Sequence, residues 1–309
     1  MSLLVGFDNS RQSGQSARVI HICRFQTLDD LAEPRIGILK GKHTILPIPG
    51  SENMMLADLL DSGEAAQSML AAWLEVPHSE TLDLQEIQLL PPVDMQEVWA
   101  AGVTYLRSKK ARMEESEHSA SAYDQVYDAE RPEIFFKSMP HKVCGQGDPV
   151  GIRTDSQWNV PEPEVALWIN RNREIVGYTI GNDMSSRDIE GENTLYLPQA
   201  KVYDNSCALG PWITLGLTPE EAANLDVRLD ISRDGKSVFS GESSTANMKR
   251  SFDELRDFLC RCQNFTDGAV LLTGTGIVPD DTFSLQENDV VSISVKHLGT
   301  LENPVVEIS

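Results

Sequence analysis

Three acidic residues in one short stretch of the chain lie at spacings that can bind a metal ion. Glu162 and Glu164 alternate within the strand-like run PEPEVALWI, and Asp183 follows in GYTIGNDMSSRD. In an extended strand, residues two apart project from the same face, so the two glutamates point together. Two carboxylates side by side repel each other unless a cation lies between them. The spacing therefore predicts a metal site at this point of the chain.

A turn between the two runs brings the third carboxylate to the pair. If Asn172 and Arg173 are the central turn residues, positions whose numbers sum to about 345 face each other, and Glu162 lies opposite Asp183. Ligands that offer only oxygen favour Mg²⁺ first and Mn²⁺ or Ca²⁺ next. The cluster contains no histidine, which disfavours zinc. At this point an alternative stays open, in which the three are surface acids of an acidic protein.

The chain from Pro132 onward consists of short strand-like runs that would position these residues. Turn residues separate the runs, and only MKRSFDELRDFLCRC has the spacing of a helix. We therefore expect an α+β protein whose larger domain, residues 93–309, is a mostly β roll or barrel with a few helices on its rim. The runs are EIFFKS, EVALWIN, IVGYTIG, PWITLG, VRLDISR, AVLLTGTG and VVSISV.

The first 92 residues predict a small N-terminal α/β domain. RVIHICRF, RIGILKG and HTILPI are strand-like, and MMLADLLDSGEAAQSMLAAWLE has helical spacing that Asp61-Ser62-Gly63 interrupts. Pro91-Pro92 marks the boundary with the larger domain. The domain carries no residues whose chemistry we can name, so we interpret it as accessory. Residues 106–131, which are highly charged and poor in apolar side chains, form either a solvated helix or a mobile lid beside a site.

The composition limits the expected partners. The 309 residues include 26 basic and 47 acidic ones, a formal charge of −21. Such a surface repels nucleic acid and anionic membranes, so neither is an expected partner. It also repels an anionic substrate, so a site for a carboxylic acid needs a local cation. The sequence has no apolar run long enough for a transmembrane helix and no signal-peptide pattern. Its five cysteines lack the spacing of a disulfide framework or a zinc site. We therefore expect a cytoplasmic protein.

Several segments together resemble the signature of the fumarylacetoacetate hydrolase superfamily. They are PEPEVALWI, GYTIGNDMSSRD, LPQAKVYDNSCALGP and AVLLTGTGIVP, and the resemblance covers about residues 98–295. It implies that Glu162, Glu164 and Asp183 hold a divalent metal, as the E-x-E pair and the first Asp of GNDxSxRD do in that family. It also implies a mixed β-roll for the larger domain and assembly as a homodimer or a higher homo-oligomer.

The resemblance assigns further residues to the site. Lys201 in PQAK matches the family's active-site lysine, and Arg187 matches the arginine of GNDxSxRD. Gly274 and Thr275 match a Gly-Thr pair whose backbone and hydroxyl contact the substrate carboxylate. Arg187 has the alternative role of a structural ion-pair partner, because an Arg-Asp sequence at a strand end often anchors a loop.

The sequence departs from the hydrolases of this family at two points. In those hydrolases an early G-x-N-Y motif is followed by a His and a Glu that activate water. The corresponding segment here, GVTYLRSKKARMEES, has Ser108 and Ala111 at those positions. His118 lies further along the chain, and we interpret it as a surface residue. Glu190 stands where fumarylacetoacetate hydrolases carry a glutamine. Three segments are closer to the sequences of the 2-keto-3-deoxy-pentonate (arabinonate or xylonate) dehydratases of pentose degradation. They are GVTYLRSKKARMEES, RPEIFFKS and SSRDIEGENTLYLPQAKVYDNSCALGP.

The resemblance implies a Mg²⁺-dependent dehydratase of a 2-keto-3-deoxy sugar acid that yields α-ketoglutarate semialdehyde. The metal would stabilise an enolate, with Lys201 as general base or charge stabiliser. Glu133 is the candidate acid for the leaving C4 hydroxyl, and Tyr105 could hydrogen-bond substrate hydroxyls. Both have a purely structural alternative.

Three rival functions stay open at this stage. One is a C–C bond hydrolase of an acylpyruvate, and another is a decarboxylase or tautomerase of an oxaloacetate-like acid. The third is a non-catalytic metal-binding or scaffold protein, which Lys201 and the Gly274-Thr275 pair argue against. The sequence has no phosphate-binding glycine loop and no dinucleotide fingerprint, which disfavours kinases and dehydrogenases.

Overall fold

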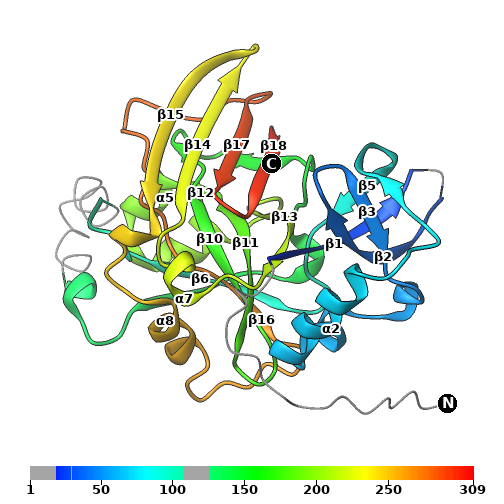
Figure 1. Cartoon of the computed structure of the whole chain (residues 1–309). Coiled ribbons are helices and arrows are strands. Elements are labelled where there is room, and N and C mark those ends of the chain that lie inside the picture. Colours follow the sequence, from blue (N-terminus) through cyan, green and yellow to red (C-terminus); the bar gives the residue numbers. More distant parts are fainter. Residues whose placement is uncertain (1–18, 29, 108–124) are drawn as a thin grey trace.

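The computed structural model describes residues 19–28, 30–107 and 125–309, which fold into a small N-terminal lobe beside a larger, strand-rich one (Figure 1). In the small lobe the helical run forms two helices, and residues 61–63 separate them as the sequence predicts. The elements of this lobe are β1 (Ile20–Thr27), β2 (Asp30–Lys40), β3 (Thr44–Pro47), α1 (Leu56–Leu60), α2 (Glu64–Leu74), β4 (Leu82–Asp83) and β5 (Ile87–Leu90).

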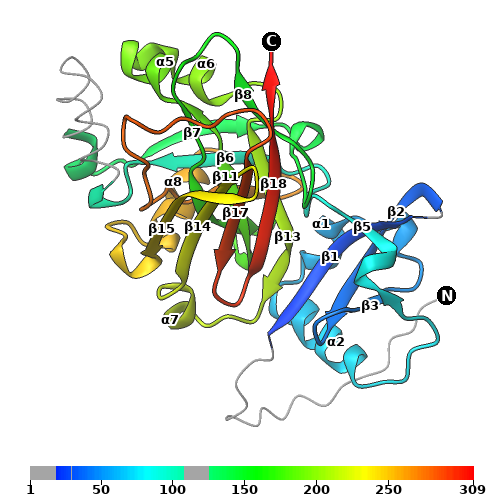
Figure 2. The same cartoon turned by 90° about the horizontal axis from the view of Figure 1, so that it is seen from above.

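One large mixed sheet runs through both lobes. Its strands follow the order β4-β3-β2-β1-β13-β11-β10-β16-β6-β7, with β5 paired to β1. The pairing of β1 with β13 joins the small lobe to the large one, and Figure 2 shows these two strands side by side. The strands of the large lobe in this sheet are β6 (Glu97–Gly102), β7 (Glu133–Ser138), β10 (Pro163–Ile169), β11 (Ile175–Asp183), β13 (Cys207–Leu215) and β16 (Ala269–Leu272).

A second sheet of five strands packs against the strands of the first sheet that belong to the large lobe. Its order is β15-β14-β17-β18-β8, and a short pair, β9 (Asn159–Val160) with β12 (Ser185–Ser186), lies apart from both sheets. Leu167 and Ile180 of the first sheet share a buried cluster with Leu229 and Ile293 of the second. The strands are β8 (Val150–Arg153), β14 (Asp226–Arg233), β15 (Lys236–Ser244), β17 (Val290–Val295) and β18 (Gly299–Ile308).

The central strands of the large sheet are buried on both faces. Every residue of β10 and β16 is buried, because one face meets the second sheet and the other meets a cluster that includes Leu56 and Leu60 of α1. Strands covered on both faces are apolar throughout, which explains the continuous hydrophobic run in EVALWI. This double covering gives the carboxylates at the start of β10 a rigid support.

Only one of the helices after residue 132 could be located from the sequence. The helix predicted in MKRSFDELRDFLCRC is present as α8 (Phe252–Leu259), but three short ones accompany it: α5 (Arg187–Glu192), α6 (Leu197–Lys201) and α7 (Pro219–Ala222). Each has four to six residues, fewer than two turns, so none can show a helical repeat in its sequence. Single 3₁₀ turns are η1 (Ser51–Asn53), η2 (Leu84–Glu86), η3 (Pro140–Lys142), η4 (Thr194–Tyr196) and η5 (Thr245–Asn247).

The hairpin β10–β11 has the predicted register but not the predicted turn. The N–H of Arg173 donates to the C=O of Asn170, so Arg171 and Asn172 are the central residues, and Arg173 follows with φ 66°. A register shift beside Trp168 then compensates for the displaced turn. From there on, the partners are those expected, including Glu164 with Gly181. The register prediction is therefore confirmed, although its stated turn is wrong by one residue.

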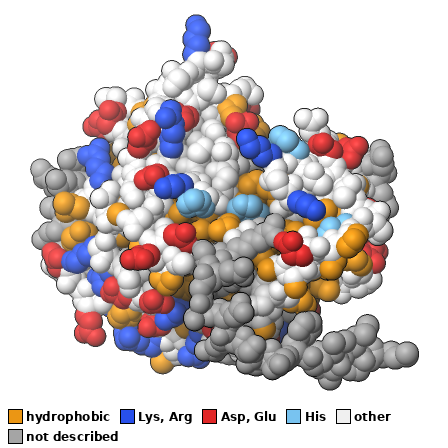
Figure 3. Space-filling model, in the orientation of Figure 1, with side chains coloured by type: hydrophobic (Ala, Val, Ile, Leu, Met, Phe, Trp, Pro, Cys, Tyr) orange, Lys and Arg blue, Asp and Glu red, His pale blue; other side chains and the backbone are white. Residues whose placement is uncertain are grey.

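The surface carries both charge signs. On the face shown in Figure 3, acidic and basic side chains are interspersed, and many ion pairs are exposed, such as Arg228 with Asp230. Among the residues that the structure describes, no helix is both long and apolar enough to cross a membrane.

Candidate metal centre and active site

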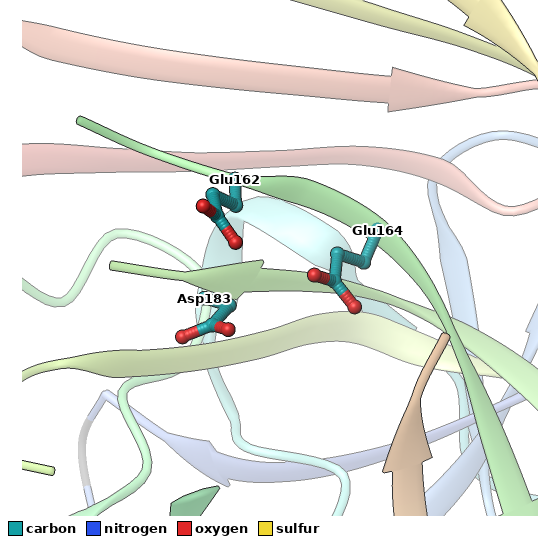
Figure 4. Close-up of side chains that lie close together, drawn as sticks. All are labelled: Glu162, Glu164 and Asp183. Carbon is teal, nitrogen blue, oxygen red and sulfur yellow. The ribbon is translucent and has the colours of Figure 1, made fainter. Parts of the chain in front are cut away.

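The three predicted carboxylates converge at one end of the β10–β11 hairpin. Glu162 immediately precedes β10, Glu164 lies within it, and Asp183 ends β11. Each offers an oxygen within 4.8 Å of those of the other two, and Figure 4 shows the three side chains close together. All three are buried. The alternative of unrelated surface acids does not hold for this arrangement.

The site fits a hard divalent cation. Octahedral Mg²⁺ with bonds of about 2.1 Å keeps its ligand oxygens roughly 3 to 4.2 Å apart, so the three carboxylates need only a small inward movement. Among the residues that the structure describes, this cluster consists of carboxylates alone, without a cysteine or histidine ligand. Burial raises the pKa of Glu164 well above its usual range, and the charges of Asp183 and Glu162 add to this effect. A cation between the carboxylates would remove that electrostatic cost.

Buried cations surround the carboxylates. The Lys201 ammonium, at the end of α6, donates to Glu162 Oε2 at 2.7 Å, to Asp183 Oδ2 at 3.0 Å and to Ser185 Oγ at 2.6 Å. Arg187 pairs with Glu162 Oε1 at 2.7 Å, and Lys137 pairs with Asp183 Oδ1. Three buried acids are thus matched by three buried bases.

A small cavity lies against the carboxylates and contains most of the residues expected to act on a substrate. Glu133, Lys201, Gly274 and Thr275 line it together with the three carboxylates. Its remaining lining residues are Ala101, Gly102, Val103, Phe135 and Glu190. A larger cleft of about 1000 Å³ lies elsewhere, along α2 and α8, but it contains none of the predicted site residues. The small cavity is therefore the candidate active site.

The Gly274-Thr275 pair is partly engaged by the protein itself. The N–H of Gly274 donates to Glu164 Oε2 at 2.6 Å, and the backbone there has φ 92°, which favours glycine. The Thr275 hydroxyl exchanges hydrogen bonds with the N–H and C=O of Ile277. Gly274 thus supports one of the predicted metal ligands directly, and contact of the pair with a substrate carboxylate stays a prediction.

Two of the predicted substrate-binding residues do not line the cavity. Arg187 is 1% exposed, and its guanidinium faces Glu162, which is the ion-pair role considered as its alternative. Tyr105 is buried and forms a β-bridge with Met248. Burial raises the pKa of the Tyr105 phenol, and the charge of Glu164 adds to the increase. Roles for both residues in substrate binding stay predictions.

Sequence reasoning missed several residues of the site. Phe135 and Lys137 lie on β7 with Glu133, and Gly102 faces Glu133 across the β6–β7 pair. The alternation in EIFFKS places residues 133, 135 and 137 on one face and could have revealed this group. Ser185, which binds Lys201, lies inside the quoted GNDMSSRD motif. Residues 106–131, for which a solvated helix or a lid was expected, fall largely outside the described residues, as do Ser108, Ala111 and His118.

Comparison with known proteins agrees with this geometry. Residues 97–306 match the family described as fumarylacetoacetate (FAA) hydrolase C-terminal. A Haloferax volcanii protein named probable 2-keto-3-deoxyxylonate dehydratase is 49% identical over 217 residues, which cover 70% of this chain and 74% of that protein. The 2-dehydro-3-deoxy-D-arabinonate dehydratase of Saccharolobus solfataricus is 40% identical over 229 residues, 73% of this chain and 77% of that one.

Solved structures resemble the whole fold. A hexagonal crystal form of 2-keto-3-deoxyarabinonate dehydratase has a TM-score of 0.79 and 32% identity, and the match covers 94% of this chain and 100% of that one. A 2-keto-3-deoxy-D-arabinonate dehydratase complexed with magnesium and 2,5-dioxopentanoate has a TM-score of 0.76 and 32% identity, over 94% and 99% of the two chains. The similarity includes the N-terminal lobe, since it extends well beyond residues 97–306.

Proposed function

Because the chain belongs to the fumarylacetoacetate hydrolase family, we propose that it is a metal-dependent dehydratase of a 2-keto-3-deoxy sugar acid, most simply a pentonate. The observation that carries the proposal is the buried cluster of Glu162, Glu164 and Asp183, which adjoins a cavity containing both Lys201 and Glu133. The reaction removes a proton from C3 and the hydroxyl from C4 as water, which leaves a double bond between C3 and C4. A proton from C5 and the proton of the C5 hydroxyl then move to C3 and C4, and the product is a 2,5-dioxo acid.

The metal we propose is Mg²⁺, with Mn²⁺ or Ca²⁺ as alternatives, held by the three carboxylates. When bound, it supplies Lewis-acid stabilisation to the negative charge that develops on the 2-oxo group. The relative with magnesium and 2,5-dioxopentanoate supports this choice. The remaining chemistry falls to the chain's own side chains.

Lys201 is the proposed base for the C3 proton. Its ammonium is buried, and it lies in the cavity wall between two metal-binding carboxylates and Ser185. A neutral amine is needed to accept a proton, and a nearby divalent cation favours the neutral form of a lysine. If Lys201 stays charged, it stabilises the enolate instead, which is the second role expected from the sequence.

Glu133 is the proposed acid for the departing hydroxyl. It begins β7 and lines the cavity. With the substrate's 2-oxo group at the metal, C4 would lie on the far side of the cavity. In its protonated form this carboxyl group would deliver a proton to the leaving oxygen. Glu190, buried in the same cavity wall, gives this end of the pocket a second carboxyl group that hydrolases with glutamine lack.

An assay with two substrate classes tests the proposal. The purified protein with Mg²⁺ is incubated separately with 2-keto-3-deoxy-pentonates and with acylpyruvates, and products are identified by mass. If the protein is a dehydratase, the product is 18 mass units lighter than the sugar acid, because water is lost. Cleavage of the acylpyruvate with gain of water would instead favour a C–C bond hydrolase. A separate incubation with oxaloacetate tests for a decarboxylase, which would release carbon dioxide.

Location in the cytoplasm and assembly into a homodimer or larger homo-oligomer stay predictions. Light scattering coupled to size-exclusion chromatography measures the assembly, and cell fractionation measures the location. Substrate stereochemistry is open to the same product assay, run on the separate pentonate isomers.

A further inference from the structure

Strand β7 contributes a continuous side of the active site. Glu133, Phe135 and Lys137 alternate along it and therefore share one face. Glu133 and Phe135 line the cavity, and the ring of Phe135 lies 5.8 Å from the Lys201 ammonium. Lys137 is the third member of this face, but it lies deeper, is 0% exposed and does not reach the cavity.

The Lys137 ammonium is surrounded by groups that build the site itself. The ammonium contacts Asp183 Oδ1, the backbone C=O of Lys201 and, at 3.0 Å, the C=O of Met184. It donates hydrogen bonds to the two carbonyls and forms an ion pair with the Asp183 carboxylate. The contacts of Lys137 are thus with the protein itself, and it does not line the cavity.

Its three contacts connect the two functional parts of the site. One oxygen of Asp183 faces Lys137, and the other faces Lys201 at 3.0 Å. The same ammonium holds the backbone of Lys201, where α6 ends. A single buried charge thus fixes both the carboxylate that would bind the metal and the chain segment that carries the proposed base.

We propose that Lys137 is a positioning residue that orients Asp183 for the metal and fixes the backbone of Lys201. The inference rests on the proposed function only for the role of Lys201, since the contact with Asp183 concerns metal binding alone. Partners that orient metal ligands through their second contacts typically change metal affinity 10- to 100-fold when they are removed.

The test replaces Lys137 with methionine, which has nearly the same length but no charge and no donor. Mg²⁺ affinity is measured by calorimetry without substrate, together with the unfolding temperature, kcat and KM. We expect the dissociation constant for Mg²⁺ to rise about 10- to 100-fold and kcat to fall with little change in KM. Lys137→Gln, which is smaller and keeps donors, should show the same direction and serves if Lys137→Met does not fold.

Arg233→Met is the matched control. It breaks an ion pair with the fully buried Asp289, whose contacts are 2.7 and 2.8 Å, and neither residue lines the small cavity. We expect it to lower the unfolding temperature without changing Mg²⁺ affinity.

The sign of the affinity change separates the possible roles. If Lys137 were only a counter-charge, its removal would leave the carboxylates more negative and Mg²⁺ would bind more tightly. If it were only structural, Lys137→Met would behave like Arg233→Met. Either result overturns the inference. Weaker Mg²⁺ binding in a protein whose wild type dehydrates no sugar acid would support the inference and refute the proposed function.

Discussion

Gly102 offers a way to move the Glu133 carboxyl group without altering its chemistry. The two residues face each other across the β6–β7 pair, and a methyl group added at Gly102 would lie 2.0 Å from Glu133 Oε2. Gly102 is not among the residues with positive φ, so alanine fits its backbone. Gly102→Ala therefore tests the proposed acid by steric displacement alone.

The size of the effect follows from that distance. Contacts of a Cβ atom under 3.0 Å essentially never occur, so the carboxyl group must move by at least about 1 Å. A displacement of about 1 Å can lower the rate of a positioned reaction roughly 100-fold, or about 2.7 kcal/mol in activation free energy. Folding should not suffer, because replacing glycine with alanine restricts the unfolded chain and stabilises by about 0.4 to 1 kcal/mol where the backbone allows it.

Two rates are followed in the same samples in heavy water. Dehydration is measured from product formation, and removal of the C3 proton is measured from deuterium uptake into the remaining substrate by NMR, against an enzyme-free control. We expect Gly102→Ala to lose about 100-fold in dehydration while C3 exchange continues, because Lys201 is not displaced. Glu133→Gln should give the same pattern, with a loss of about 10²- to 10⁴-fold.

The double variant Gly102→Ala/Glu133→Gln shows whether the methyl group acts through Glu133. If it does, the double variant is no slower than Glu133→Gln alone, because the two changes remove the same interaction. Wild-type dehydration in Gly102→Ala, or losses that multiply in the double variant, would refute the assignment of Glu133 as the acid.

Three further predictions concern the metal, the base and the alkaline stability. Chelation should abolish turnover, and Glu164→Gln should weaken Mg²⁺ binding measured by calorimetry and lower kcat at least 100-fold; full activity of that variant in the presence of chelator contradicts the mechanism. Lys201→Met should lose both C3 exchange and dehydration, by about 10²- to 10⁴-fold, and continued exchange would exclude Lys201 as the base. Burial raises the pKa of Cys23 to about 12, whereas the unfolded thiol ionises near 8.5, so the folded protein holds a proton that the unfolded chain releases. The free energy of unfolding, measured in urea, should fall between about pH 8.5 and about pH 12. This fall should be less steep in Cys23→Ala than in the wild type. An equal dependence on pH in both proteins would show that Cys23 plays no part.

The metal cluster could be predicted from sequence because its ligands lie close together in the chain. Glu162, Glu164 and Asp183 belong to a single hairpin, so alternation and register are enough to bring them together. The prediction also tolerated an error in the turn. The central residues lie one position earlier than expected, and the register shift beside Trp168 restores the expected pairing. The identity of the turn residues was therefore less informative than the apolar pattern of the two strands.

The rest of the site depends on contacts between distant segments. Lys137 meets Asp183 and Lys201, which are 46 and 64 positions away in the chain. β7 reaches the site through β6, which pairs in parallel with β16, and no local pattern specifies such a connection. The short helices α5 and α6 are similarly fixed by packing rather than by periodicity. The resemblance to a family supplied Lys201, but it did not supply the residues that support it.

The charges around the cluster explain how an acidic protein can bind an acid. When ionised, Glu162, Glu164 and Asp183 contribute three negative charges, which Lys137, Lys201 and Arg187 balance. Direct ion pairs join these bases to Glu162 and Asp183, and Glu164 lies beside them. This balance lets the site fold without a metal. A divalent cation added to it leaves two positive charges in surroundings of low polarity, where electrostatic attraction is strong. The carboxylate of a 2-oxo acid offsets one of them, and the charge that develops on its 2-oxo group offsets the other. The local cation required by a net charge of −21 is therefore created only when the metal binds.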